Sequence, residues 1–140
     1  MNLEFLESFK DEFIGSDEGK GIMLAGISLG MLADQQRKDP QMTVADTPLF
    51  KQINWGKLDY RDLKKHMARV PELTRAYNVK YASLINALNA KSGEFMLMSA
   101  AKRMGPDGNF TFTVGFVRCN DYFWQVFKSQ KNESEVNENV

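Results

Sequence analysis

Cysteine and histidine are almost missing from this 140-residue chain, which has one of each. A zinc finger, an iron–sulfur site and a disulfide framework each need several such side chains, so these classes are excluded. Long hydrophobic runs are missing too. The longest, GIMLAGISLGMLA at residues 21–33, is shorter than the ~20 residues that a membrane-spanning helix requires, so we predict a buried core helix there and no membrane partner.

Neither sign of charge is in excess, because 18 basic side chains balance 18 acidic ones. Nucleic-acid-binding proteins usually carry a basic excess, so the zero net charge argues at first against that class. The first residues, MNLEFLESFKDEF, are acidic where a targeting signal would be basic, and the lone Cys119 suits a reducing compartment. We therefore expect a cytoplasmic protein. The 43% apolar and 26% charged composition is typical of one globular domain.

The spacing of apolar residues predicts an all-α fold, a compact bundle of five or six helices. We place residues 1–127 in one domain and expect a disordered acidic tail at residues 128–140, where the apolar periodicity is lost. Ser16, Asp59 and Ser92 are expected N-caps. The helices are predicted at residues 3–13, 17–38, 59–69, from Pro71 onward, 77–91, 94–104 and 110–127, with a short helical turn within residues 49–55.

Two segments need further argument. Phe110, Phe112, Val114 and Phe116 alternate as in a strand, but one strand would have no partner in a helical chain, so we favour a helix at residues 110–127. Residues 105–108, Gly-Pro-Asp-Gly, are expected to form a loop. In the central helix Gly26 and Gly30 lie one turn apart, which lets a neighbouring helix approach closely.

Two motifs resemble catalytic or phosphate-binding sequences. Gly26-Ile-Ser28-Leu-Gly30 matches the G-x-S-x-G nucleophile elbow, but it lies inside a predicted helix rather than on a strand-to-helix turn. Residues 15–21, GSDEGKG, lack the G-K-[ST] ending of a phosphate loop and carry carboxylates that repel phosphate. The single His66 has no partner with which to form a site. We therefore expect no enzyme activity, no cofactor and no metal.

The zero net charge hides an uneven distribution. Residues 1–19 carry a net charge of −5, whereas residues 51–103 have eleven basic and four acidic side chains, a net of +7. Arg61, Lys65 and Arg69 recur every four residues and predict a basic stripe along one helix, which can follow a phosphate backbone or can be an ordinary solvated face. The candidate nucleic-acid-binding residues are Lys57, Arg61, Lys64, Lys65, Arg69, Arg75, Lys102 and Arg103.

Three segments together suggest a family: GIMLAGISLGMLADQQ, TPLFKQINWGKLDYRDLKKHMARVPEL and NFTFTVGFVRCNDYF. They resemble the C-terminal region of the large subunit of type I-B CRISPR Cascade complexes, over about residues 20–125. That region has an apolar helix rich in small residues, a P-F-x-x-x-L-x-x-L-K-L-D-x-x-D-L-x-x-L segment and an aromatic helix with a central Gly. The middle pattern falls on Pro48, Leu49, Phe50, Ile53, Lys57, Leu58, Asp59, Asp62 and Leu63.

In this family the C-terminal region is also made as a separate chain, the small subunit. The resemblance therefore implies a non-catalytic subunit that assembles in more than one copy along the crRNA-bound backbone subunits, beside the large subunit. It would stabilise the R-loop by holding the non-target DNA strand without sequence specificity, while a separately recruited nuclease-helicase cleaves the target. No family motif identifies the basic stripe as the contact, and the acidic start and tail cannot lie along DNA.

A helical protein-interaction module without nucleic-acid contact is the alternative. The sequence leaves open the copy number, the exact CRISPR subtype, and which basic residues contact DNA rather than RNA or protein.

Overall fold

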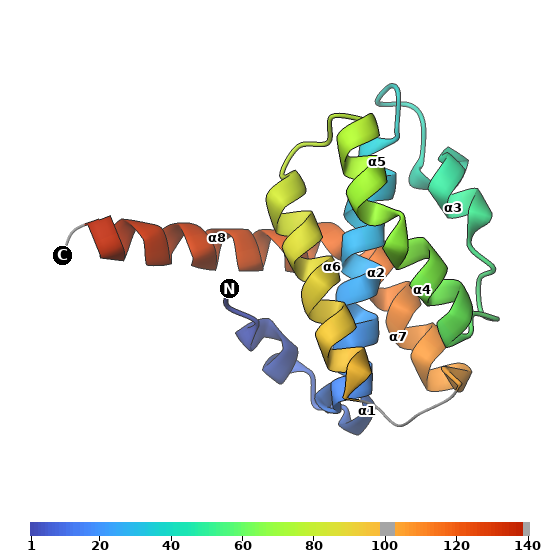
Figure 1. The fold of residues 1–140 in the computed structure, drawn as a ribbon, viewed down its shortest axis with the longest axis horizontal. Coiled ribbons are helices and arrows are strands. Elements are labelled where there is room, and N and C mark those ends of the chain that lie inside the picture. The colour runs from blue at the N-terminus through green and yellow to red at the C-terminus, as the bar shows by residue number, and fades with distance from the viewer. Residues whose placement is uncertain (99–102, 139–140) are drawn as a thin grey trace.

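Helix α2 (Asp17–Gln35) lies at the centre of the fold (Figure 1). The computed structural model describes the backbone of residues 1–98 and 103–138, and side chains through residue 132. The Ser16 hydroxyl caps α2 by accepting a hydrogen bond from the Gly19 N–H at 3.1 Å, as predicted. From Gly21 to Ala33 every residue of α2 is buried. The apolar run is therefore a core helix, enclosed mainly by α6 (Ala82–Leu97) and α7 (Gly105–Val117).

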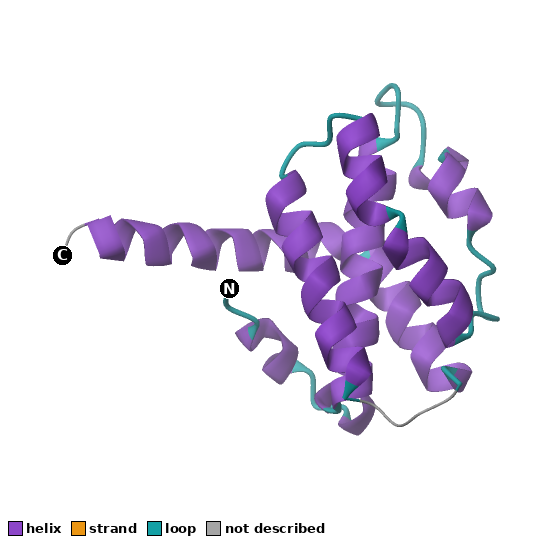
Figure 2. Ribbon diagram, viewed as in Figure 1, coloured by secondary structure: helices purple, strands orange, loops and turns teal. Residues whose placement is uncertain are grey.

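The remaining elements surround this centre, and no strand occurs in the part of the chain that the structure describes (Figure 2). The all-α bundle is thus confirmed. Helices α4 (Tyr60–Ala68) and α5 (Val70–Ala76) follow one another along one side of α2 (Figure 1). Helix α8 (Cys119–Glu138) packs against the bundle by its first part and then projects from it (Figure 1). The other elements are η1 (Glu4–Ser8), α1 (Glu12–Gly15), η2 (Val44–Asp46) and α3 (Pro48–Gln52).

The glycines of α2 allow α7 to approach its backbone, as the sequence predicted. A Cβ atom on Gly26 would lie 2.6 Å from the Phe112 carbonyl oxygen, and one on Gly30 would lie 2.6 Å from that of Phe116. The contact is reciprocal, since a Cβ on Gly115 of α7 would lie 2.6 Å from the Met23 carbonyl oxygen. No larger residue fits these three positions without moving a helix.

The N-terminal segment is not the single helix expected at residues 3–13. It consists of η1 and the short α1, because the Asp11 carboxylate accepts hydrogen bonds from Phe13 N–H at 2.9 Å and Ile14 N–H at 3.1 Å and so starts a new helix. Phe5 of η1 still packs inward, with its ring stacked on Tyr122 of α8 at 5.4 Å between centroids.

The chain after Tyr77 also departs from the prediction. Ser92 does not cap a new helix. It lies buried within the continuous α6 and donates a hydrogen bond to the Gly21 carbonyl of α2 at 2.5 Å, which is why a small polar residue stands there. Residues 105–108 form the first turn of α7 rather than a loop. A helix rather than a strand over residues 110–117 is confirmed. The single helix expected at residues 110–127 is nevertheless divided at Arg118, where α7 ends and α8 begins.

The C-terminal segment begins as an amphipathic helix and ends as a polar one. Phe123 and Val126 of α8 are buried in the core. The later part of α8 projects from the bundle (Figure 1), and its backbone continues as helix to Glu138, where the sequence predicted a disordered tail from residue 128.

Candidate nucleic-acid interface

Helix α4 displays the basic stripe on the side opposite the core. Asp59 caps the helix in a reciprocal capping box with Asp62, and Tyr60 is anchored to α2 by donating its hydroxyl to the Glu18 carboxylate. Tyr60, Leu63 and Met67 are buried. This orientation leaves Arg61, Lys65 and Arg69 exposed. The predicted stripe therefore exists as a surface feature, available to a polyanion or to solvent.

The other predicted basic residues are distributed over three places. Lys64 lies at the α4 edge of an apolar groove against α6, whose lining includes Met67 and Leu97. Arg75 is exposed on α5, the helix that follows α4. Lys57 and Arg103 lie with Arg61 around a cleft. Lys102 lies outside the residues that the structure describes.

The cleft has a volume of about 630 Å³ and opens between the start of α4 and the start of α7. Its walls are residues 56–61 on one side, and residues 103–106 with Asn109 on the other. Among the described residues, three cationic side chains from different parts of the chain line it, against one carboxylate, that of Asp59. That carboxylate accepts the Asp62 N–H at 2.9 Å as the helix cap.

A buried amide joins the two walls of the cleft. The Asn109 side chain of α7 accepts the Leu58 N–H at 2.8 Å and donates to the Leu58 carbonyl at 3.0 Å. It also donates to the Gly105 carbonyl of its own helix at 2.9 Å, which fixes its orientation. These bonds clamp the backbone next to Lys57 to α7, the helix that follows Arg103.

The cations of the stripe are not neutralised by nearby carboxylates in the described part of the chain. The Arg69 guanidinium donates to the neutral Gln52 side chain at 2.7 Å. Within the described residues no ion pair involves Lys57, Arg61, Lys65, Arg69 or Arg103.

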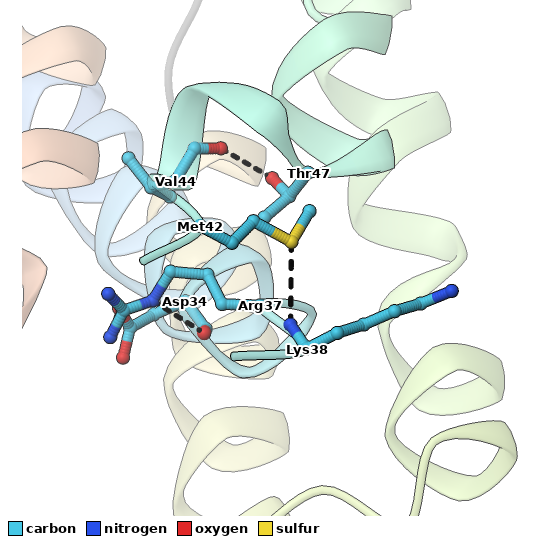
Figure 3. A network of polar contacts seen from close by, with 6 residues as sticks. All are labelled: Asp34, Arg37, Lys38, Met42, Val44 and Thr47. Atoms are coloured by element: carbon cyan, nitrogen blue, oxygen red, sulfur yellow. Dashed lines mark hydrogen bonds and ion pairs between the residues drawn. The ribbon is translucent and has the colours of Figure 1, made fainter. Parts of the chain in front are cut away.

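The Arg37-Lys38 pair at the end of α2 differs from the stripe. Arg37 forms an ion pair with Asp34 at 3.1 Å, and its Nε also donates to the Asp34 carbonyl (Figure 3). The Lys38 side chain points away from this network, while its backbone N–H contacts the Met42 sulfur at 3.4 Å (Figure 3). Lys38 is therefore an isolated surface cation, and Arg37 is neutralised locally.

His66 differs from the cations of the stripe. It is half-buried on α4, whereas Arg61 and Lys65 are exposed. Burial, and secondarily the neighbouring Arg69, lower the pKa of His66 below its usual value, which disfavours its charged form.

Ser28, the serine of the G-x-S-x-G motif, and the thiol of Cys119 are both buried. Ser28 is fully buried within α2, where its hydroxyl donates to the Leu24 carbonyl at 2.8 Å. Burial, and secondarily Asp34, raise the pKa of Cys119 to about 12. Among the described residues no three His, Cys, Asp or Glu side chains gather as a metal site would require, and no helix there is long and apolar enough to cross a membrane.

The sequence predicts the stripe but not the cleft or the Asn109 clamp. Residues 57 and 103 are far apart in the chain, and no local pattern marks them as neighbours. Asn109 falls between the loop expected at residues 105–108 and the helix expected at residues 110–127. Because α7 begins at Gly105, Asn109 lies on its buried side, which the expected boundaries do not indicate.

The comparisons with known proteins identify the family. The family model described as the CRISPR-associated protein TM1802 C-terminal domain matches residues 2–133. Neither the curated proteins nor the solved structures contain a match to the chain. The match covers nearly the whole chain and includes both α4 and the cleft, so the CRISPR association expected from the three sequence segments is confirmed. The chain belongs to the family of CRISPR-associated TM1802 C-terminal domains.

Proposed function

We propose that this protein is a non-catalytic subunit of a CRISPR surveillance complex and binds nucleic acid without sequence specificity. The observation that carries the proposal is the exposed row of Arg61, Lys65 and Arg69 on the outer side of α4, in a chain of a CRISPR-associated family. None of the three forms an ion pair with another described residue. Cations at this spacing recur about every 6 Å along a helix axis and can contact successive parts of one phosphate backbone. No base-reading motif accompanies them, so the contacts would be electrostatic.

The finer assignment is a small subunit of a type I-B Cascade complex. In that role the chain would lie beside the large subunit, the backbone subunits and the crRNA, with further copies of itself. It would stabilise the R-loop by holding the non-target strand on the α4 surface. The net charge of −5 over residues 1–19 favours protein rather than DNA as the neighbour of the N-terminal segment.

A protein-interaction module is the second candidate, and one observation favours it. Leu97, at the edge of the groove between α4 and α6, is 84% exposed, and Met98 beside it is 61% exposed. Exposed apolar side chains next to a groove are typical of protein contacts. In this alternative the basic stripe would only be solvated.

The two candidates differ in the effect of charge reversal. The test variant carries Arg61→Glu, Lys65→Glu and Arg69→Glu. The matched control carries Lys10→Glu, Lys38→Glu and Lys80→Glu, which changes the net charge equally at exposed positions elsewhere. Binding of a fluorescein-labelled dT20 strand is followed by anisotropy at several salt concentrations.

We expect the stripe variant to lose at least about tenfold in affinity and to show a shallower dependence on salt, because fewer counterions are released. The control should lose less than about threefold. Equal losses would mean that only net charge matters. Absence of dT20 binding by the unaltered protein at low salt would favour the protein-interaction module.

A further inference from the structure

We propose that the cleft between α4 and α7 is a binding site, here called the seat, for one phosphodiester group of a single nucleic-acid strand. Lys57, Arg61 and Arg103 would hold that group. The inference rests on the proposed function and adds a discrete binding site to it. It also assigns Asn109 as the residue that positions two of the three cations.

Three positive charges from separate parts of the chain meet at the cleft. Lys57 precedes α4, Arg61 lies in its first turn, and Arg103 precedes α7, yet all three line the same hollow. Like charges repel, so a fold brings three cations together at some energetic cost unless an anion neutralises them. Asp59 supplies one negative charge there, and it is engaged as the helix cap. The cleft therefore keeps an excess of positive charge that a phosphate group would balance.

The size of the cleft favours a single strand over a duplex as the ligand. A volume of about 630 Å³ lies within the roughly 300–1,000 Å³ of small-ligand pockets, so the cleft can hold one nucleotide of a strand, with its phosphodiester group on the cations, but not a duplex. A flexible single strand can bend a phosphate into such a hollow, whereas a duplex would rest on the α4 stripe outside it. Arg61 belongs to both surfaces, so the strand would pass from the stripe into the cleft.

The clamp by Asn109 gives the cleft a defined shape. Asn109 is 8% exposed, and both polar atoms of its side chain amide are hydrogen-bonded. Its bonds to Leu58 hold the backbone next to Lys57, and its bond to Gly105 holds the backbone two residues after Arg103. Asn109 carries no charge, so its removal tests the geometry of the site separately from its electrostatics.

The first experiment compares three ligands at several salt concentrations: dT20, U20 and a 20-base-pair DNA duplex. The cleft variant is Lys57→Ala with Arg103→Ala, and the matched control is Lys38→Ala with Lys80→Ala. Arg61 is left unchanged because the stripe shares it. We expect the cleft variant to lose about tenfold in affinity for the single strands and less than threefold for the duplex, with the control within twofold for all ligands. The salt slope for single strands should fall by about 1.4, which corresponds to two lost contacts at about 0.7 each.

The second variant, Asn109→Leu, keeps the γ-branched shape of the side chain and removes its hydrogen bonds to Leu58 and Gly105. We expect it to lower single-strand affinity and the salt slope in the same direction, and to add little further loss when combined with Lys57→Ala and Arg103→Ala. A purely structural role would lower the melting temperature and leave the salt slope unchanged, and that result would overturn the assignment of Asn109.

The outcomes separate the cleft from the wider proposal. If the cleft variant binds like its control while the stripe variant is impaired, the cleft is not a binding site and the proposed function stands. Equal losses for duplex and single strands would also overturn the seat, because the cations would then act only as general surface charge. If the unaltered protein binds none of the ligands, the proposed function itself fails. A loss confined to U20 or to dT20 supports the seat and identifies the strand as RNA or DNA.

Discussion

The close contact between α2 and α7 predicts opposite effects for one substitution at two glycines. Gly26 lies where the backbones of the two helices meet, and a Cβ there would lie 2.6 Å from the Phe112 carbonyl oxygen and 3.0 Å from the Phe116 nitrogen. Gly93, also inside a helix, has no atom within 4 Å of the corresponding position. Gly93→Ala is therefore a control for Gly26→Ala with the same chemical change and no steric conflict.

The two free-energy terms have different signs. Alanine is favoured over glycine in a helix interior by about 1 kcal/mol, a gain that both variants share. At Gly26 the opposing atoms are backbone and cannot rotate away, so we assign the upper part of the usual overpacking cost, about 3 kcal/mol. Gly26→Ala should then be destabilised by about 2 kcal/mol, whereas Gly93→Ala should be stabilised by about 0.5–1 kcal/mol.

Thermal and urea unfolding followed by circular dichroism measure both variants. At roughly 4 °C per kcal/mol, the melting temperature should fall by roughly 8 °C for Gly26→Ala and rise by up to about 4 °C for Gly93→Ala. If Gly26→Ala is as stable as the unaltered protein, the two helices do not approach as closely as described. If Gly93→Ala is less stable than the unaltered protein, another part of the chain must lie within contact distance of the added methyl group.

Two further predictions concern titrating groups. Burial lowers the pKa of His66 in the folded protein, whereas histidine in the unfolded chain titrates near 6.5. Below about pH 6.5 the unfolded chain therefore binds more protons than the folded one, and the free energy of unfolding falls as the pH drops. His66→Gln should reduce the difference between urea midpoints at pH 7.5 and pH 5.5, and an unchanged difference would assign that loss to other groups. With a pKa of about 12, the buried Cys119 is only about one part in 10⁴ thiolate at pH 8, so a chromogenic disulfide should label it no faster than the protein unfolds. Rapid labelling of the folded protein would contradict its burial.

The sequence predicted those features that depend on neighbouring residues. Ser16 and Asp59 cap α2 and α4 because a cap bonds to N–H groups two or three residues away. The apolar run of α2 is buried as expected, because a helix that is apolar on all sides must be enclosed by other elements. The exposed stripe on α4 followed from its four-residue spacing.

The errors have a common physical origin. Ser92 has the side chain of a cap, but its partner is the Gly21 carbonyl, far away in the chain. Asp11 competes for backbone N–H groups and divides a segment whose apolar spacing fitted one helix. The cleft was missed for the same reason, because the approach of Lys57 to Arg103 depends on how α4 and α7 pack on α2.

Reconstitution tests most directly whether this chain acts as a nucleic-acid-binding subunit of a CRISPR complex. The Cascade subunits and crRNA would be purified with and without this chain, the copies of the chain in the complex counted, and the affinity for target DNA measured at one salt concentration. We expect the chain to co-purify with the crRNA-containing complex and to raise its affinity for target DNA, whereas the stripe variant should join the complex without raising that affinity. A chain that stays out of the complex, or that joins it and leaves the affinity for target DNA unchanged, would contradict the proposed function.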